Sequence, residues 1–389
     1  MACREVRIMT QHLVPNRHPV RAAIAAIAVI SIGILAGCSS SAPPEGGDQG
    51  SGEGGSPVHL RVASYIGTGT PAVQASQQWT DLVTEYTAGG ITFEWFLSES
   101  LLPAAEILGG VGSGTVDMGL TGHGYHPGEL PLTQGINAGF GSSNAQAVAA
   151  ALRDFYESND AFRAEWDATN VRPILFTALP SLVVGCNFPV AGIDDLKGKN
   201  VRAAGLPAED FAAIGANVVA LTAPDMLDAF DRGIIDCWAA DLPLANDNGL
   251  TQITPYVYDY GRGGNGSQEF MISQTVWDSL SDAQRDAMER ATDEVNDEYF
   301  KTTLAAAVTA GCDAIKEGGG TMSFLPDAAQ AEWKALADPV SVKRFVEMTG
   351  GSSDGQKFPN EYTSAVQINE TKFDNYVDPN VTCAERFQG

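Results

Sequence analysis

The feature that most constrains the fold is an alternation of short apolar strands with helices, which occurs twice along the chain. The first series has predicted strands at 58–63, 91–97 and 116–120, separated by an amphipathic stretch that ends near 87 and a helix at 104–112. The second has strands at 200–203, 218–221 and 234–238, with helices near 208–214 and 225–232. This order implies largely parallel sheets with helices on both faces. Two successive α/β units predict two lobes.

A very long helix is predicted after the second unit. Ser281 and Gln284 form a capping box, and no Pro interrupts the chain before the glycines at 318–320. At 1.5 Å per residue this helix would span ~50 Å, enough to run across both lobes. Gly311 is a possible break.

Less regular segments complete the organisation. One or two helices are expected at 145–168, and an apolar run at 171–184 is broken by Pro173 and Pro180. Helical stretches are expected near 328–336 and 340–348.

The N-terminus indicates export. Four Arg precede an apolar run at 22–35 that is shorter than the ~20 residues of a transmembrane helix. The run ends in LAGC at 35–38, which resembles a bacterial lipobox. That resemblance implies cleavage before Cys38, lipidation of its thiol, and anchoring at the outer face of the cell membrane. The alternative is an ordinary secretory signal with an incidental Cys, and either Met1 or Met9 is the start. Residues 38–57 are rich in Gly, Ser and Pro, which predicts a flexible tether.

The charge of the mature chain narrows the partners. Removing residues 1–37 takes four Arg and one Glu from the totals of 23 and 48, which leaves 19 basic and 47 acidic side chains and a charge of −28. Nucleic acid is therefore not expected as a partner. An acidic ligand stays possible, because salt screens the overall field over ~8 Å and local groups dominate in a cleft.

Four cysteines remain after Cys38, and in an exported chain an even number favours disulfides. Of the three possible pairings we favour Cys186 with Cys237 and Cys312 with Cys383. The first two lie near strands of one predicted lobe, and the last two lie in the C-terminal third. A zinc site is the alternative, but no pair is spaced as CxxC and His is scarce.

Sequence signals for catalysis are weak. GGVGSG at 109–114 lacks the Lys and the Gly spacing of a nucleotide loop, and we interpret it as a helix end and turn. His123 and His126 have a spacing that suits a metal on a helix, but neighbouring Gly and Pro place them in a loop. There is no Ser nucleophile elbow. We predict no enzymatic activity, no cofactor and no metal.

Several short motifs occur in one order. TAGGIT lies at 87–92, AEIL at 105–108, VGSGTVDMG at 111–119, DLKGKNVR at 195–202, IGANVV at 214–219, AFDRGIID at 229–236 and WDSL at 277–280. Together they resemble the substrate-binding proteins of TRAP transporters, the C4-dicarboxylate-binding family. The resemblance covers roughly 58–325.

The resemblance implies a two-lobed α/β fold of the periplasmic-binding-protein type, with crossing strands and a long helix spanning both lobes. Residues 58–179 and about 266–305 would form lobe I, and residues 180–265 and about 306–389 lobe II. The ligand would bind in the cleft between them. Arg202 matches the family's arginine that clamps the ligand carboxylate, since a guanidinium binds a carboxylate through two parallel hydrogen bonds. The alternative is a surface Arg paired with one of the many acids.

Other site residues follow from departures from the family pattern. Leu182 stands where several members have a second arginine, and Ala223 replaces a frequent aromatic residue. Trp238 is a candidate aromatic wall of the site, with core packing as the alternative, and Asp241 is a candidate acceptor for a hydroxyl or amine. Polar residues on loops after strands of the first lobe also become candidates: Tyr65, Thr68, His123 and Tyr125.

The predicted function is therefore an extracytoplasmic receptor that captures a small organic acid and delivers it to the membrane subunits of a TRAP-type secondary transporter. The alternatives are a ligand-sensing lipoprotein and an ABC-type solute-binding protein. A secreted enzyme on this fold would need turnover that no group of residues here predicts.

Overall fold

The computed structural model describes residues 56–264 and 266–388. Cys38, the predicted signal peptide and the tether up to residue 55 lie outside the described residues. No helix in the described ranges is both long and apolar enough to cross a membrane.

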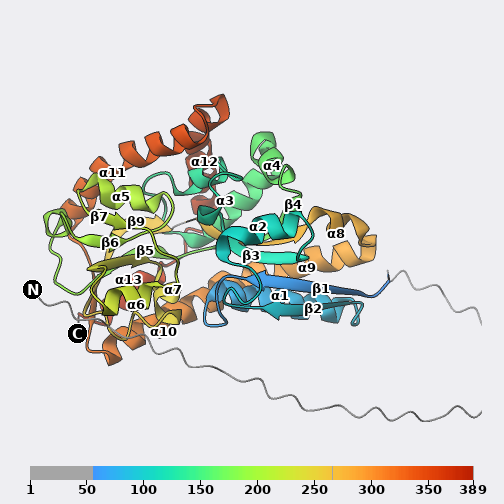
Figure 1. Ribbon diagram of the computed structural model, residues 1–389, viewed down its shortest axis with the longest axis horizontal. Helices are drawn as coiled ribbons and strands as arrows, with labels where there is room; N and C mark the ends of the chain where they lie inside the picture. Colours follow the sequence, from blue (N-terminus) through green and yellow to red (C-terminus); the bar gives the residue numbers. More distant parts are fainter. Residues whose placement is uncertain (1–55, 265, 389) are drawn as a thin grey trace, which may run out of the picture. The chain divides into compact units, whose positions relative to one another are not determined.

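The first lobe is built on a five-stranded sheet in the order β2-β1-β3-β10-β4 (Figure 1). Its strands are β1 (Val58–Ser64), β2 (Ile91–Phe96), β3 (Met118–Gly122), β4 (Val171–Ala178) and β10 (Ser267–Ser273). β1 pairs in parallel with β2 and β3, as the β-α-β-α-β order predicts, while β10 runs antiparallel to β3 and β4. Helices α1 (Pro71–Tyr86) and α2 (Ala104–Gly112) connect the parallel strands.

The second lobe is built on a six-stranded sheet in the order β11-β9-β5-β8-β6-β7. Its strands are β5 (Ser181–Cys186), β6 (Asn200–Arg202), β7 (Asn217–Val219), β8 (Cys237–Ala240), β9 (Tyr256–Gly264) and β11 (Thr321–Phe324). Short helices follow the inner strands: α5 (Pro207–Ala213), α6 (Met226–Asp231) and α7 (Leu242–Asp247). Parallel pairing of β6 with β7 and β8 places the carboxyl ends of these strands on one side of the sheet.

The chain crosses directly from a strand of one sheet to a strand of the other twice, and it passes between the sheets once more through the helices that join β10 to β11. β4 ends in the first sheet at Ala178 and β5 begins in the second at Ser181. On the return, β9 ends in the second sheet at Gly264 and β10 begins in the first at Ser267. The predicted fold class, two α/β lobes with crossing strands, is confirmed. The residue boundaries proposed for the lobes stay a prediction.

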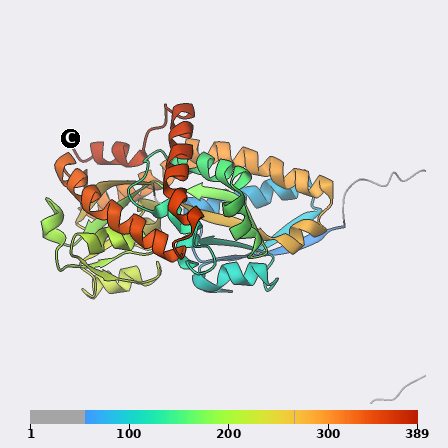
Figure 2. The ribbon, with the colours of Figure 1, turned by 90° about the horizontal axis from the view of Figure 1, so that it is seen from above.

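The long helix is continuous and carries one irregular turn. It runs as α9 (Asp282–Glu298), a π-helical turn at Tyr299–Thr303 and α10 (Leu304–Glu317), and is orange in Figure 2. The capping box is present: Ser281 Oγ accepts from Gln284 N, and Gln284 Oε1 accepts from Ser281 N. α9 packs on α1 of the first lobe and α10 on α7 of the second.

Gly311 does not break the helix. A Cβ there would lie 2.8 Å from Leu242 Cγ, so the glycine lets α10 approach α7 closely.

The remaining helices cover the outer faces: α3 (Ala145–Ser158), α4 (Asp160–Asp167), α8 (Gln274–Ser279), α11 (Asp327–Met348), α12 (Ser353–Lys372) and α13 (Pro379–Glu385). The helical stretches expected near 328–336 and 340–348 are one helix, α11, which contains Pro339. Trp333, Ala337 and Phe345 are buried on both sides of this proline, so packing holds the two halves as one helix. α12 has no counterpart among the predicted elements.

Two disulfides join elements that are distant in sequence. Cys186 is bonded to Cys237, its cross-strand neighbour between β5 and β8. Cys312 of α10 is bonded to Cys383 of α13. The second bond attaches the C-terminal helix to the long helix.

Candidate functional site

A small cavity lies where the loops and strand ends of the two lobes meet. Its volume is about 90 Å³. The lining residues are Tyr65, Gly122, His123, Gly124, Tyr125, Asn137, Leu179, Leu182, Arg202, Ala203, Ala204, Gly205, Pro207, Ala239, Ala240, Asp241, Leu244 and Gln268. Five of the seven predicted ligand-binding residues are among them, and they come from both lobes.

Arg202 is the last residue of β6 and is only 3% exposed. Its Nε donates to Leu221 O at 3.0 Å and its Nη1 donates to Ala239 O at 3.1 Å, which holds the guanidinium in one orientation. It forms no salt bridge with any Asp or Glu of the described residues, and burial lowers its pKa. Arg202 is therefore a buried positive charge whose hydrogen bonds go to neutral groups.

Two tyrosines of the first lobe lie beside this arginine: Tyr125 is hydrogen-bonded to its guanidinium, and Tyr65 interacts with it electrostatically. Tyr65 and Tyr125 pack edge to face with ring centroids 5.2 Å apart. Tyr65 Oη accepts a hydrogen bond from Gln268 Nε2 at 2.8 Å, so its own proton stays available as a donor. Burial raises the pKa of both phenols, and Arg202 partly offsets this for Tyr125. Both phenols are therefore protonated donors at neutral pH.

Asp241 adds an acidic group to the same cavity. It is the N-cap of α7, and its Oδ1 accepts from Leu244 N at 2.9 Å. Burial raises its pKa to about 6, although the Leu244 N–H and Arg202 both act in the opposite direction. The structure places Asp241 in the cavity lining, and its predicted role as a polar acceptor beside the ligand stays a prediction.

His123 faces the cavity but both ring nitrogens already have partners. Nδ1 lies 2.8 Å from Glu269 Oε1 and Nε2 lies 2.7 Å from Asn137 Nδ2. Its backbone N–H also donates to Glu269. These contacts hold the loop after β3 against β10 and leave the imidazole little capacity to bind a ligand.

His126, the other member of the pair, is directed elsewhere. It contacts Thr121 Oγ1 at 3.2 Å, and burial lowers its pKa to about 4. Among the described residues no group of three or more His, Cys, Asp or Glu side chains is placed to hold a metal ion.

Trp238 and Thr68 do not line the cavity. Trp238 is fully buried and its Nε1 donates to Thr254 Oγ1 at 2.9 Å. Gly185 pairs with it across β5 and β8, and a Cβ at Gly185 would overlap the indole ring. The structure thus places Trp238 in the core, the alternative considered from the sequence, because the ring fills the space that Gly185 leaves. Thr68 is exposed on the loop after β1.

The lining also includes residues that were not predicted as site residues. Gln268 of β10 positions Tyr65, and Asn137 contacts His123, while its Oδ1 is buried without a partner among the described residues. Leu179 lies on the crossing segment between β4 and β5. No local motif marks these positions: Leu179 and Gln268 reach the cavity through the two crossings between the sheets, and Asn137 reaches it from the turn at Thr133–Asn137.

The lobes touch on two sides of the cavity, so the structure is a closed form. A Cβ at Gly124 of the first lobe would lie 3.9 Å from Gly205 Cα of the second. Asp247 of α7 lies against the backbone of Gly67 and Gly69 in the loop after β1; burial raises its pKa, and the two N–H groups offset part of this.

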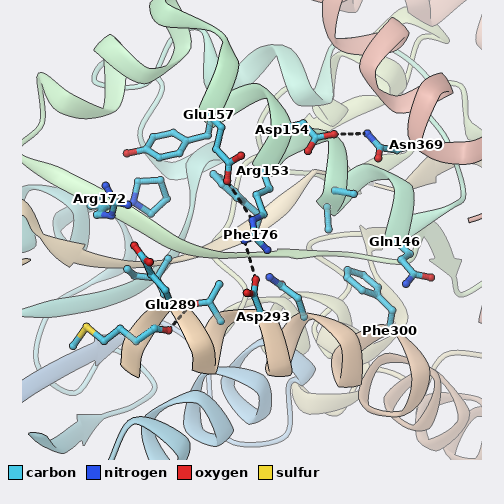
Figure 3. A pocket seen from close by; sticks show the side chains of 18 of the residues that line it. Gln146, Arg153, Asp154, Glu157, Arg172, Phe176, Glu289, Asp293, Phe300 and Asn369 are labelled. Carbon is cyan, nitrogen blue, oxygen red and sulfur yellow. Dashed lines mark hydrogen bonds and ion pairs between the residues drawn. The ribbon is translucent and has the colours of Figure 1, made fainter. Parts of the chain in front are cut away.

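A larger hollow of about 730 Å³ lies within the first lobe, between α3, β4 and α9 (Figure 3). Arg172 lies over the Trp277 ring, and several other charges form ion pairs: Arg153 Nη2 lies 2.9 Å from Asp293 Oδ1 and also contacts Glu157, and Lys372 lies 3.6 Å from Asp154. The side chains of these ion pairs are about half exposed, so water solvates them. The smaller cavity is the better candidate site, because its arginine is buried and forms no salt bridge with an Asp or Glu of the described residues.

The fold and the charged interlobe cavity define a class, the two-lobed solute-binding proteins. Residues 62–347 match the model of the DctP family, described as bacterial extracellular solute-binding protein, family 7. The match covers well over half of the chain, and the protein belongs to this family. This confirms the resemblance drawn from the sequence motifs and, at the level of the family, the predicted role as an extracytoplasmic solute receptor.

The chain is also similar to two curated proteins. An outer membrane transporter protein, TsaT, of Comamonas testosteroni is 23% identical over 296 residues, which are 75% of this chain and 86% of the relative. A monocarboxylate 2-oxoacid-binding periplasmic protein, all3028, of Nostoc sp. (strain PCC 7120) is 28% identical over 241 residues, 60% of this chain and 63% of the relative.

Solved structures share the fold. A TRAP solute-binding protein from a marine metagenome superimposes with a TM-score of 0.73 at 18% identity, over 80% of this chain and 99% of that one. The Bordetella pertussis extracytoplasmic solute receptor DctP7 superimposes with a TM-score of 0.68 at 20% identity, over 78% and 99%. At these identities the likeness supports the two-lobed architecture, and the ligand has to be inferred from the cavity itself.

Proposed function

We propose that this protein binds a small organic acid in the interlobe cavity, with Arg202 holding the carboxylate, and delivers it to a TRAP-type transporter. The observation that carries the proposal is the environment of Arg202: a buried guanidinium with neutral partners and no salt bridge among the described residues. An anion bound in the cavity would supply the missing negative charge.

The energetics favour an anionic ligand over an empty cavity. A buried ion without a counter-ion costs several kcal/mol, because the low-dielectric interior replaces only part of its hydration. A carboxylate recovers this cost through charge-assisted hydrogen bonds of ~1.5–3 kcal/mol each. The guanidinium has five N–H donors, and its two bonds to carbonyls leave others for the ligand.

The ligands of similar proteins are compatible with this proposal. The metagenome protein was solved with metahydroxyphenylacetate, the Bordetella receptor binds pyroglutamic acid, and a Pseudomonas aeruginosa protein was solved with L-malate. Each of these ligands carries a carboxylate. For the present chain these ligands suggest a carboxylate, and the particular acid has to be inferred from the residues that line the cavity.

The remaining parts of the function extend the family role. The receptor would be held at the outer face of the cell membrane through lipidated Cys38, with residues 38–57 as a tether. It would hand its ligand to the membrane subunits of the transporter and would have no catalytic step of its own. Opening of the lobes at the Gly124–Gly205 contact would release the ligand.

A thermal-shift screen of the purified full chain against organic acids, sugars and amines tests the proposal. A ligand at ~100 times its dissociation constant stabilises the folded state by ~2.7 kcal/mol, a shift of several degrees. We expect acids to raise the melting temperature of the wild type but not of Arg202→Ala.

Arg153→Ala is the matched control, because it removes an arginine from the larger hollow and should keep the full ligand shift. Circular dichroism establishes that each variant is folded. Stabilisation by sugars or amines alone, or an equal acid shift in Arg202→Ala, contradicts the proposal.

A further inference from the structure

The cavity holds a second buried charge, and this restricts which acids fit. Asp241 is 3% exposed and lines the same wall as Arg202. Its carboxylate accepts from Leu244 N through Oδ1 and from its own backbone N–H, and no hydrogen bond from another described side chain reaches it. A carboxylate has about four acceptor sites, so it can still accept from a ligand donor. The following inference rests on the proposed function, since it assumes that Arg202 holds a carboxylate.

The charges that line the cavity match one carboxylate and not two. Arg202 is the one Arg or Lys among the described lining residues, and Asp241 is the one Asp or Glu. A second ligand carboxylate would share this small space with Asp241 and find no second cation, since Leu182 and Leu179 occupy the crossing side of the wall. Like charges this close in a buried site oppose binding strongly.

The volume favours a small ligand. The cavity measures about 90 Å³ in this closed form, against about 730 Å³ for the larger hollow. A compact acid with few non-hydrogen atoms beyond its carboxylate therefore fits best.

We infer that the ligand is a small monocarboxylate with a hydrogen-bond donor, a hydroxyl or an ammonium group, close to its carboxylate, and that Asp241 accepts from this donor. Asp241 is then the residue that distinguishes 2-hydroxy or 2-amino acids from 2-oxo acids, unsubstituted acids and dicarboxylates. Its capping bond to Leu244 fixes the carboxyl group at the amino end of α7, facing the guanidinium.

The ionisation of Asp241 should make the affinity for a hydroxy acid and the affinity for an amino acid respond differently to pH. Arg202 from β6, Tyr65 from β1 and Tyr299 from the π-helical turn interact electrostatically with it, and Leu244 N–H binds it from its own helix. An ammonium group gains more from an ionised Asp241 than a neutral hydroxyl does, so raising the pH from 5 to 8 should favour the amino acid over the hydroxy acid. An amino acid binds best when Asp241 is ionised, so its affinity should rise over the same interval.

Five acids of nearly equal size test the inference in the full chain by calorimetry: lactate, alanine, pyruvate, propionate and malonate. We expect lactate or alanine to bind at least about tenfold more tightly than the other three, the effect of one hydrogen bond to a charged acceptor. Equal or tighter binding of pyruvate, propionate or malonate overturns the inference.

Asp241→Asn isolates the role of the carboxylate, because Asn caps a helix as well as Asp does and the fold is kept. In this variant we expect the preference to shrink to within about threefold, the pH dependence to disappear and malonate to bind more tightly. Asp228→Asn, on the exposed face of α6, is the control and should behave as the wild type. An unchanged preference in Asp241→Asn also overturns the inference.

The outcomes separate this inference from the proposed function. If none of the five acids binds, the best acid of the thermal-shift screen takes their place. The inference is supported if that acid has one carboxylate and a hydrogen-bond donor, and if an analogue without the donor binds more weakly. The inference is overturned if the acid has a second carboxylate or no such donor. Acids that bind without needing Arg202 would instead contradict the proposed function.

Discussion

Two buried arginines of the second lobe have opposite surroundings. Arg262 on β9 is 1% exposed, and its Nε contacts Asp210 Oδ2 of α5 at 2.5 Å. Its Nη2 also donates to Asn137 O, across the interface with the first lobe. Arg202 is as deeply buried, but its hydrogen bonds go to neutral groups, the Leu221 and Ala239 carbonyls and the Tyr125 hydroxyl. One charge is neutralised within the fold and the other is directed at a cavity.

The difference separates a structural charge from a binding charge. Breaking a buried ion pair leaves its partner uncompensated, so Arg262 is expected to matter for stability. Arg202 has no such partner, so its removal should cost the fold less and the ligand more. Burial alone does not separate these roles, and the identity of the partner does.

The largest effect is expected for Arg262→Ala, which leaves Asp210 buried without its cation. We expect a loss of ~3–5 kcal/mol in the free energy of unfolding, measured by urea denaturation. The double variant Arg262→Met/Asp210→Leu should recover most of this loss, because it removes both charges. A single variant within about 1 kcal/mol of the wild type would remove the distinction between the two arginines.

A buried acid without a cation should destabilise the fold as the pH rises, whereas an acid paired with a cation stabilises the fold as the pH rises. Asp259 on β9 lies near Asp378, and burial raises its pKa to about 7. Since this folded pKa exceeds the unfolded value of ~3.9, the protonated acid stabilises the fold at low pH, and that contribution is lost as the pH rises to about 7.

Asp259→Asn does not ionise, so its stability relative to the wild type should increase by roughly 2–3 kcal/mol between pH 5 and pH 7.5. Urea denaturation at both pH values measures this. Glu289→Gln, a change in an acid at the wall of the larger hollow, is the control. If the difference in unfolding free energy between Asp259→Asn and the wild type does not change with pH, another residue takes up the proton, for example Asp378.

For Arg202→Ala without ligand we expect a smaller loss of ~1–2 kcal/mol, because water entering the cavity can solvate the Leu221 and Ala239 carbonyls. The affinity for the acid should fall roughly 100-fold, the effect of losing two charge-assisted hydrogen bonds. Denaturation and calorimetry on the same samples measure the two quantities. A stability loss as large as that of Arg262→Ala, with affinity kept, would reverse the comparison.

The smallest effect is expected for Arg153→Ala in the larger hollow. Its side chain is 46% exposed, and its ion pairs with Asp293 and Glu157 are open to solvent. We expect a loss below ~1 kcal/mol that shrinks further in 1 M salt. Denaturation at low and high salt tests this, and a loss above about 2 kcal/mol would show that the hollow has a structural role.

Most of the regular elements could be predicted because their signals are local. Strand β1 begins at Val58, as its apolar pattern indicates, and the long helix begins at the capping box of Ser281. The helix α12 was missed because Gly355 and Pro359 suppress its helical signal, and its buried face, with Phe358 and Tyr362, forms only in tertiary contact, chiefly with α3. Likewise, two helical stretches were expected near 328–336 and 340–348, and packing joins them across Pro339 into α11.

The candidate site was predictable only in part. Arg202, Tyr65, Tyr125, His123 and Asp241 follow strands whose carboxyl ends meet, so their approach to one cavity was expected. Trp238 was harder to place, because alternate residues of β8 face opposite sides of the sheet and only the space above Gly185 decides which side holds the indole. The engagement of His123 with Glu269 depends on β10, which reaches β3 through the second crossing.

The sequence by itself determined the class of the protein: two α/β units, a long helix, and a family motif that ends in Arg202. These properties depend on local residue patterns and on their order along the chain, and both can be read from the sequence. Only the tertiary structure decided that Arg202 has no carboxylate partner while Arg262 has one, and that Asp241 shares the cavity with it. Charge compensation depends on distances between residues far apart in the chain, and those distances exist only once both crossings and the long helix bring the lobes together.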